Sequence, residues 1–260
     1  MNERQKNALD FLLYSYCSIS FDDLNEPYSK EALGYLVDRA YKDAASHVLS
    51  VEPKIDCNPK DSARNKLLKG INDLTDRDQS TDRDQSYDAW HHELCKTICK
   101  EYSDQSNSTT MSYGIAQKWV NMTMKNLMVV YDVACLTDAS NFTFVEKYRP
   151  LIEQYREQFH VPVDSYIIDR SWSLDDNSVD LPLKDDKTKR IKKYATPSSY
   201  VKPWSQWKDN DNKEEGEKNE YQRFQESLRK ALAEVPIDWE GPAWIEQAKK
   251  RNRKTDLEKE

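Results

Sequence analysis

One stretch of the sequence decides the fold, and it reads SYGIAQKWVNMTMKNLMVVYDVACL at residues 112–136. Its apolar side chains recur at steps of three and four residues, which is the period of an α-helix. Further apolar residues fall outside the main stripe, as in a helix that is buried on more than one side. The stretch therefore predicts a long central helix. The stripe consists of Ala116, Trp119, Val120, Thr123, Leu127, Val130, Tyr131 and Ala134.

The same helical period marks other parts of the chain. The segments are residues 29–51, 60–74, 87–103, 143–159 and 219–235. Glycine is scarce, with five residues among 260, whereas a β-rich chain needs many tight turns and those usually use glycine. We therefore expect an all-α fold, a multi-helix globular domain with a central buried helix and a long irregular loop region.

The pattern also predicts an order of parts along the chain. Residues 1–172 form a helical core, and residues 173–216 form an irregular loop that is first basic and aromatic and then acidic. Residues 217–250 contain C-terminal helices that pack on the core, the last of them beginning near Pro242. Residues 251–260 form a charged tail that frays.

Composition narrows the class of protein. The net charge is −7, so the chain as a whole does not have the basic character typical of nucleic-acid binding proteins. No run of about 18 apolar residues occurs, and the N-terminus lacks the features of a signal peptide. The five scattered cysteines suit reduced thiols, without a zinc site or another cofactor. We expect a cytoplasmic monomer that does not enter a membrane.

Two short segments point to a function. They are GIAQK at residues 114–118 and HVPVDSYIIDR at residues 160–170. Together they resemble the helix-hairpin-helix DNA glycosylase superfamily, in which a G-x-G-x-K hairpin leads into a helix and a downstream V-P-V-D-T-H-V-x-R segment follows. Ala116 stands in place of the second glycine of the hairpin. The aspartate and arginine of the second segment match Asp164 and Arg170.

This resemblance implies base excision from DNA, with Asp164 and Lys118 as catalytic residues. Asp164, at the N-cap of a helix beginning at Ser165, would stabilise the positive charge that develops on the sugar. Lys118 would attack C1′ of the sugar if burial lowers its pKa, and the strand would then be nicked. If Lys118 is not placed for attack, Asp164 would activate water and leave an abasic site. The sequence does not decide between these two mechanisms.

Further residues are candidates for contact with DNA, either through the hairpin and its downstream segment or through the basic run 184–193. They are Gly114, Gln117, His160, Arg170, Lys189, Arg190, Lys192 and Lys193. Trp204 and Trp207 follow the basic run and are candidates for stacking on a flipped base, including a bulky or glycosylated one.

Each of these assignments has a plainer alternative. In the alternative interpretation, Lys118 is a surface lysine of a core helix and Asp164 is an ordinary N-cap. The segment around Trp204 and Trp207 is then a plug that anchors a loop to the core. A non-enzymatic helical protein-interaction module is the alternative function, and a helical nuclease ranks last because it lacks an acidic or histidine cluster.

Overall fold

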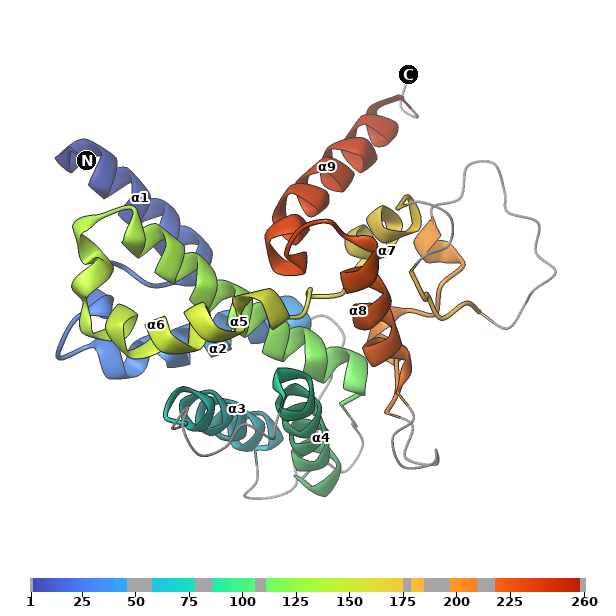
Figure 1. Ribbon diagram of the computed structural model, residues 1–260, viewed down its shortest axis with the longest axis horizontal. Helices are drawn as coiled ribbons and strands as arrows, with labels where there is room; N and C mark the ends of the chain where they lie inside the picture. Colours follow the sequence, from blue (N-terminus) through green and yellow to red (C-terminus); the bar gives the residue numbers. More distant parts are fainter. Residues whose placement is uncertain are drawn as a thin grey trace. The chain divides into compact units, whose positions relative to one another are not determined.

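The computed structural model describes residues 2–45, 58–77, 86–105, 111–174, 179–184, 197–209 and 218–257. These residues form nine α-helices with short 3-10 turns and contain no β-strand, only an isolated bridge between Leu183 and Val201. The predicted all-α fold is confirmed (Figure 1). The helices are α1 (Glu3–Cys17), α2 (Ser29–Ala44), α3 (Pro59–Thr75), α4 (Tyr87–Gln105), α5 (Tyr113–Cys135), α6 (Thr143–Tyr155), α7 (Ser165–Trp172), α8 (Glu220–Ala231) and α9 (Pro236–Leu257).

The chain divides into two compact units. Unit 1 comprises Met1–Met111 with Ala116–Phe159, and unit 2 comprises Ser112–Ile115 with His160–Glu260. The boundary therefore follows Phe159, and α7, which the sequence analysis assigned to a core of residues 1–172, belongs to unit 2. In the part of the chain that the structure describes, no helix is both long and apolar enough to cross a membrane.

Helix α5 is the centre of unit 1, as predicted (Figure 1). The Trp119 indole N–H donates to the carbonyl of Val37 in α2 at 2.9 Å. Asn121 meets His91 of α4, with 2.8 Å between Oδ1 and Nε2. Toward α6, Arg156 of the adjoining 3-10 turn makes two hydrogen bonds to Asp132, at 2.7 and 3.0 Å. Three neighbours thus surround one helix, which explains why its apolar residues extend beyond a single stripe.

Helix α8 organises unit 2 through polar contacts with the segment that precedes α7. The Gln225 side-chain amide donates to the carbonyl of Val161 at 2.7 Å and accepts from its N–H at 3.1 Å. Four residues earlier on α8, the Tyr221 hydroxyl lies 2.8 Å from Nδ1 of His160. Because these contacts satisfy buried backbone groups, they fix the extended approach to α7.

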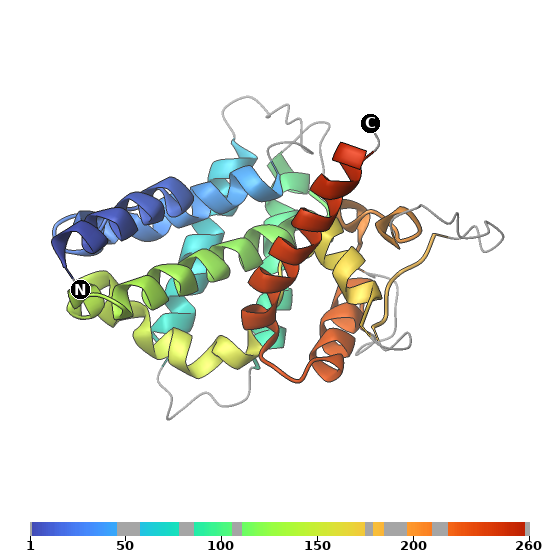
Figure 2. The same ribbon diagram turned by 90° about the horizontal axis from the view of Figure 1, so that it is seen from above.

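Helix α9 differs from the prediction at both ends. It begins at Pro236 rather than near Pro242, and the Val235 carbonyl accepts the N–H groups of Asp238 and Trp239. It also continues through residues 251–257, which the sequence analysis treated as a fraying tail. Arg251, at the start of this extension, bonds to Ser165 and pairs with Asp169 of α7, which Figure 2 shows beside α9. Tertiary contact therefore outweighs the weak apolar pattern of this segment.

Candidate functional site at the start of helix α7

Asp164 is the N-cap of α7, as its sequence context predicts. Its backbone is extended, and Oδ1 accepts the N–H groups of Tyr166 at 2.9 Å and Ile167 at 3.0 Å. These are first-turn donors that have no partner within a helix. The negative charge also lies at the positive end of the helix dipole. The short helix α7 thus begins at Ser165 because Asp164 closes its first turn.

The second carboxylate oxygen of Asp164 is held by α9. Oδ2 accepts the Trp244 indole N–H at 3.1 Å. The Trp244 ring is 38% exposed and packs against Tyr166, with 5.0 Å between ring centroids. The result is a half-buried carboxylate of fixed orientation beside two aromatic rings. Such a group can stabilise a positive charge without first reorganising.

Arg251 of α9 makes further contacts that stabilise the first turns of α7. Its guanidinium lies 4.0 Å from the Tyr166 ring centroid and donates to the Ser165 carbonyl at 2.9 Å. It also forms an ion pair with Asp169, whose side chain is fully buried. The N–H of Ser198 donates to the same carboxylate at 2.7 Å. These contacts set the start of α7 against α9.

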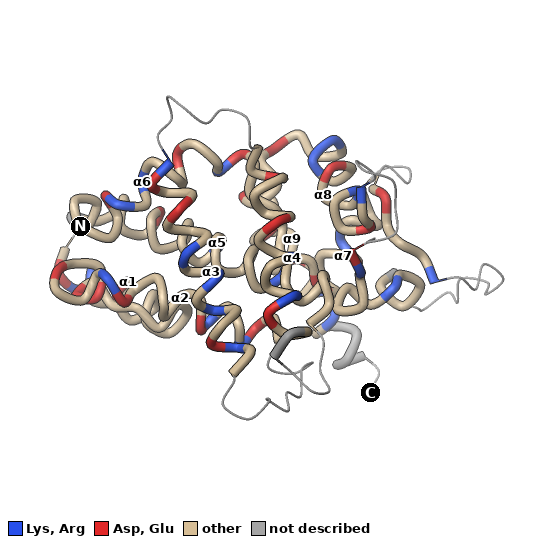
Figure 3. Tube along the Cα trace, turned by 90° about the horizontal axis from the view of Figure 1, so that it is seen from below, with Lys and Arg blue, Asp and Glu red and all other residues tan. Residues whose placement is uncertain are grey.

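Arg170, a candidate DNA contact, is tied to α9 as well. Its Nε lies 3.3 Å from a carboxylate oxygen of Glu246, and its Nη1 donates to the Ser173 hydroxyl at 2.9 Å. The hydrogen bond from Lys250 and the charge of Arg170 lower the pKa of Glu246 below its usual value. Charges of both signs are interspersed along the helices of each unit (Figure 3).

The GIAQK segment forms the first turns of α5. The Gly114 N–H donates to the Trp207 carbonyl at 2.9 Å, so this donor is already engaged. A Cβ at this position would lie 1.8 Å from the Trp204 carbonyl oxygen, which explains the glycine. Gln117, in unit 1, is fully buried and accepts from the Asn121 amide at 2.9 Å. Both residues are buried and take part in packing contacts.

His160 and Trp207 are also buried rather than available to a nucleic acid. His160 is 4% exposed and is bonded to Tyr221. Trp207 is fully buried, donates from its indole nitrogen to the Lys202 carbonyl at 3.0 Å and meets the Phe224 ring edge-on. The interpretation of this segment as a plug is therefore the one that fits Trp207. Trp204, in contrast, is half-buried.

The two catalytic candidates belong to different units. Lys118 lies on α5 in unit 1 and is 9% exposed, whereas Asp164 lies in unit 2. Lys189, Arg190, Lys192 and Lys193 lie outside the described residues.

Sequence reasoning missed the residues of α9 that complete the site. Trp244, Gln247 and Arg251 stand at i, i+3 and i+7, which is one face of a helix. All three contact the first turns of α7, since Gln247 donates to Asp169 at 3.2 Å. This spacing indicates one helix face only if the helix continues past residue 250, whereas the prediction placed Arg251 in a charged tail.

Comparison with protein-family models, curated proteins and solved structures gave no match to this chain. The resemblance to the helix-hairpin-helix DNA glycosylases therefore rests on the two short segments alone.

Proposed function

We propose that this protein is a DNA glycosylase-like enzyme that excises a damaged or modified base, with Asp164 as its catalytic carboxylate. The observation that carries the proposal is the geometry of that carboxylate. Two backbone N–H groups and the Trp244 indole hold it in place, and it remains half-exposed. An N-cap needs only the two backbone contacts, so the third contact and the exposure favour an additional role.

Breaking an N-glycosidic bond builds positive charge on the sugar. A carboxylate fixed on one face of the sugar stabilises that charge and can orient or deprotonate the attacking water. The rings of Trp244 and Tyr166 lie beside Asp164 and offer a stacking surface for a flipped base or its sugar. These two rings replace Trp207 as candidates for base contact, and Trp204 stays a candidate.

Charge for phosphate contacts is present on the same helix. Residues 249–254 read KKRNRK, five basic residues without an acidic one, of which Arg251 is paired with Asp169 and Lys250 with Glu246. The side chains of Lys249 and Lys250 are exposed. Basic side chains along a helix can follow a phosphate backbone and position the duplex. The basic run 184–193 of the sequence stays a candidate for phosphate contact.

The direct test is a cleavage assay on labelled duplexes carrying varied damaged or modified bases, with alkali to reveal abasic sites. Wild type should release a base from at least one duplex, and Asp164→Asn should lose that activity while keeping the cap, because asparagine also caps helices. Asp180→Asn is the control, since Asp180 is an exposed carboxylate of unit 2. Nicking without alkali that is lost in Lys118→Ala would assign Lys118 as the nucleophile.

A second candidate, a helical interaction module, is favoured by one observation on α1. Phe11, Leu12 and Tyr14 are 69%, 60% and 59% exposed. Clustered exposed apolar residues mark interaction surfaces. No product on a broad panel, together with no DNA binding at low salt, would favour this module over the enzyme.

A further inference from the structure

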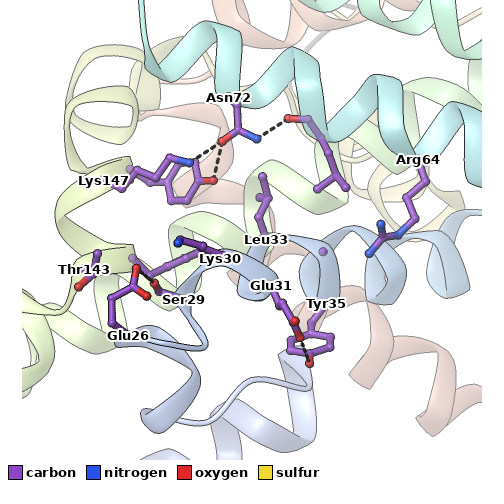
Figure 4. A pocket seen from close by; sticks show the side chains of 14 residues that line it. Glu26, Ser29, Lys30, Glu31, Leu33, Tyr35, Arg64, Asn72, Thr143 and Lys147 are labelled. Atoms are coloured by element: carbon purple, nitrogen blue, oxygen red, sulfur yellow. Dashed lines mark hydrogen bonds between the residues drawn. The ribbon is translucent and has the colours of Figure 1, made fainter.

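Unit 1 contains a cavity of about 500 Å³ lined by α2, α3 and α6 (Figure 4). This volume lies within the range of small-molecule sites. Leu33, Leu68 and Phe144 form an apolar part of its wall. The other lining residues are largely polar or charged. The cavity can therefore hold a ligand that has an apolar part and a charged group.

Two lysines of the cavity lack a carboxylate partner within the part of the chain that the structure describes. Lys30 of α2 makes no hydrogen bond or ion pair there. Lys147 of α6 donates to Oδ1 of Asn72, a neutral amide, at 2.7 Å and lies 5.0 Å from the Tyr148 ring centroid. Arg64 differs, because Asp38 neutralises it through two hydrogen bonds at 2.8 and 3.0 Å.

The ammonium of Lys147 is held in place by a small network. Asn72 Oδ1 also accepts the Tyr148 hydroxyl at 3.0 Å, and the Asn72 amide donates to the Leu68 carbonyl at 2.9 Å. Burial raises the pKa of Tyr148, so its hydroxyl remains a donor. An ammonium has three N–H donors, and only one is used here. The remaining two can reach a ligand.

Two carboxylates also line the cavity, and each already accepts a hydroxyl. Glu26 accepts from Ser29 at 2.9 Å, and Glu31 accepts from Tyr35 at 3.1 Å. Figure 4 shows Glu31 with Tyr35 on the side of the cavity away from Lys147. Figure 4 draws Glu26 near Lys30 and Thr143, so an anion is favoured beside Lys147 and on the side of Lys30 away from Glu26, and it is disfavoured near Glu31.

We propose that this cavity binds a small organic phosphate monoester, with its phosphate between Lys30 and Lys147 and its body against the apolar wall. The lysine ammonium binds phosphate as a compact point charge. A phosphate monoester carries close to two negative charges at neutral pH, so two ammonium groups attract it more strongly than they attract a singly charged carboxylate. This site is separate from the proposed base excision at Asp164.

Isothermal titration calorimetry with phenyl phosphate tests the proposal on the full chain. We expect one site per chain, and affinity about tenfold lower in Lys30→Gln and in Lys147→Gln, because each removes a charge-assisted contact. Lys30→Gln removes no contact with a described residue, so it should fold as wild type does. Lys69→Gln, an exposed α3 lysine that does not line the cavity, is the control and should bind as wild type does.

Two further ligands sharpen the test. Benzoate should bind more weakly than phenyl phosphate, and inorganic phosphate should also bind more weakly because it lacks the organic body. Asp164→Asn should leave phenyl phosphate binding unchanged. A failure of the phosphate-binding proposal can therefore be distinguished from a failure of the base-excision proposal. The proposal is overturned if phenyl phosphate does not bind at millimolar concentration, or if it binds equally to wild type, Lys30→Gln and Lys147→Gln.

Discussion

The α7 region of unit 2 and the cavity of unit 1 differ in whether their charged side chains are paired with opposite charges. Around α7, buried Asp169 is paired with Arg251, and Arg170 faces Glu246. In the cavity, Lys30 and Lys147 have no carboxylate partner in the described residues, although the space around them is open. Matched charges hold elements together, whereas charges that face an open cavity without a partner are free to meet a ligand. The comparison predicts where substitutions cost stability and where they cost binding.

The largest loss of stability should follow Arg251→Ala. The change leaves Asp169, whose side chain is fully buried, without its ion-pair partner. Removing one member of a buried pair costs about 3 kcal/mol or more of the free energy of unfolding. Urea denaturation followed by tryptophan fluorescence measures it. Lys69→Ala breaks an exposed pair with Asp73 and should cost less than about 0.5 kcal/mol. Equal losses of unfolding free energy in the two variants would refute the distinction between the buried and the exposed ion pair.

A loss nearly as large should follow Gly114→Ala. The added methyl group would meet the Trp204 carbonyl oxygen at 1.8 Å, and backbone must move to admit it. Such overpacking costs about 1–3 kcal/mol. Gly241→Ala is the matched control within unit 2, because nothing lies within 4 Å of a Cβ there and alanine favours the helix. Denaturation midpoints should therefore fall for the first variant and hold or rise for the second.

Unit 1 should gain stability from Asn126→Leu. Asn126 of α5 is 1% exposed, and neither polar atom of its side chain has a hydrogen-bond partner in the described structure. Replacing an unsatisfied buried amide by an apolar group of similar size should raise the free energy of unfolding by about 1–2 kcal/mol. Asn121→Leu should do the reverse, since it removes the hydrogen bond to His91. A decrease in Asn126→Leu would show that its amide has a partner in solution.

The smallest expected effect is a dependence on alkaline pH. Burial raises the pKa of the Cys17 thiol from 9.0 to about 12. Because the folded-state pKa is the higher one, the stabilisation is complete below pH 9 and is lost as pH rises toward 12. Between pH 8 and 10, the free energy of unfolding should fall in wild type and fall less in Cys17→Ala. Identical slopes in the two proteins would rule out this thiol as the cause.

Local patterns in the sequence predicted local features well. The period of three and four residues in 112–136 located α5, and the aspartate after Val-Pro-Val located the cap of α7. What the sequence could not supply were contacts between distant residues. Asp164 and Trp244 are 80 positions apart, and Asp169 and Arg251 are 82 apart. The roles of Gly114 and Trp207 could not be predicted for the same reason. They depend on the contact between the start of α5 and the segment of residues 204–207, which lie far apart in the sequence.

The measurement that tests the central claim most directly is the single-turnover rate of base release by wild type and by Asp164→Asn on one responsive duplex. Loss of a fixed group that stabilises transition-state charge lowers such rates by roughly a hundredfold or more. We predict a fall of that size in Asp164→Asn, with Asp180→Asn unchanged and both variants folded. Rates for Asp164→Asn within about twofold of wild type would contradict the account. Asp164 would then be a helix cap and nothing more.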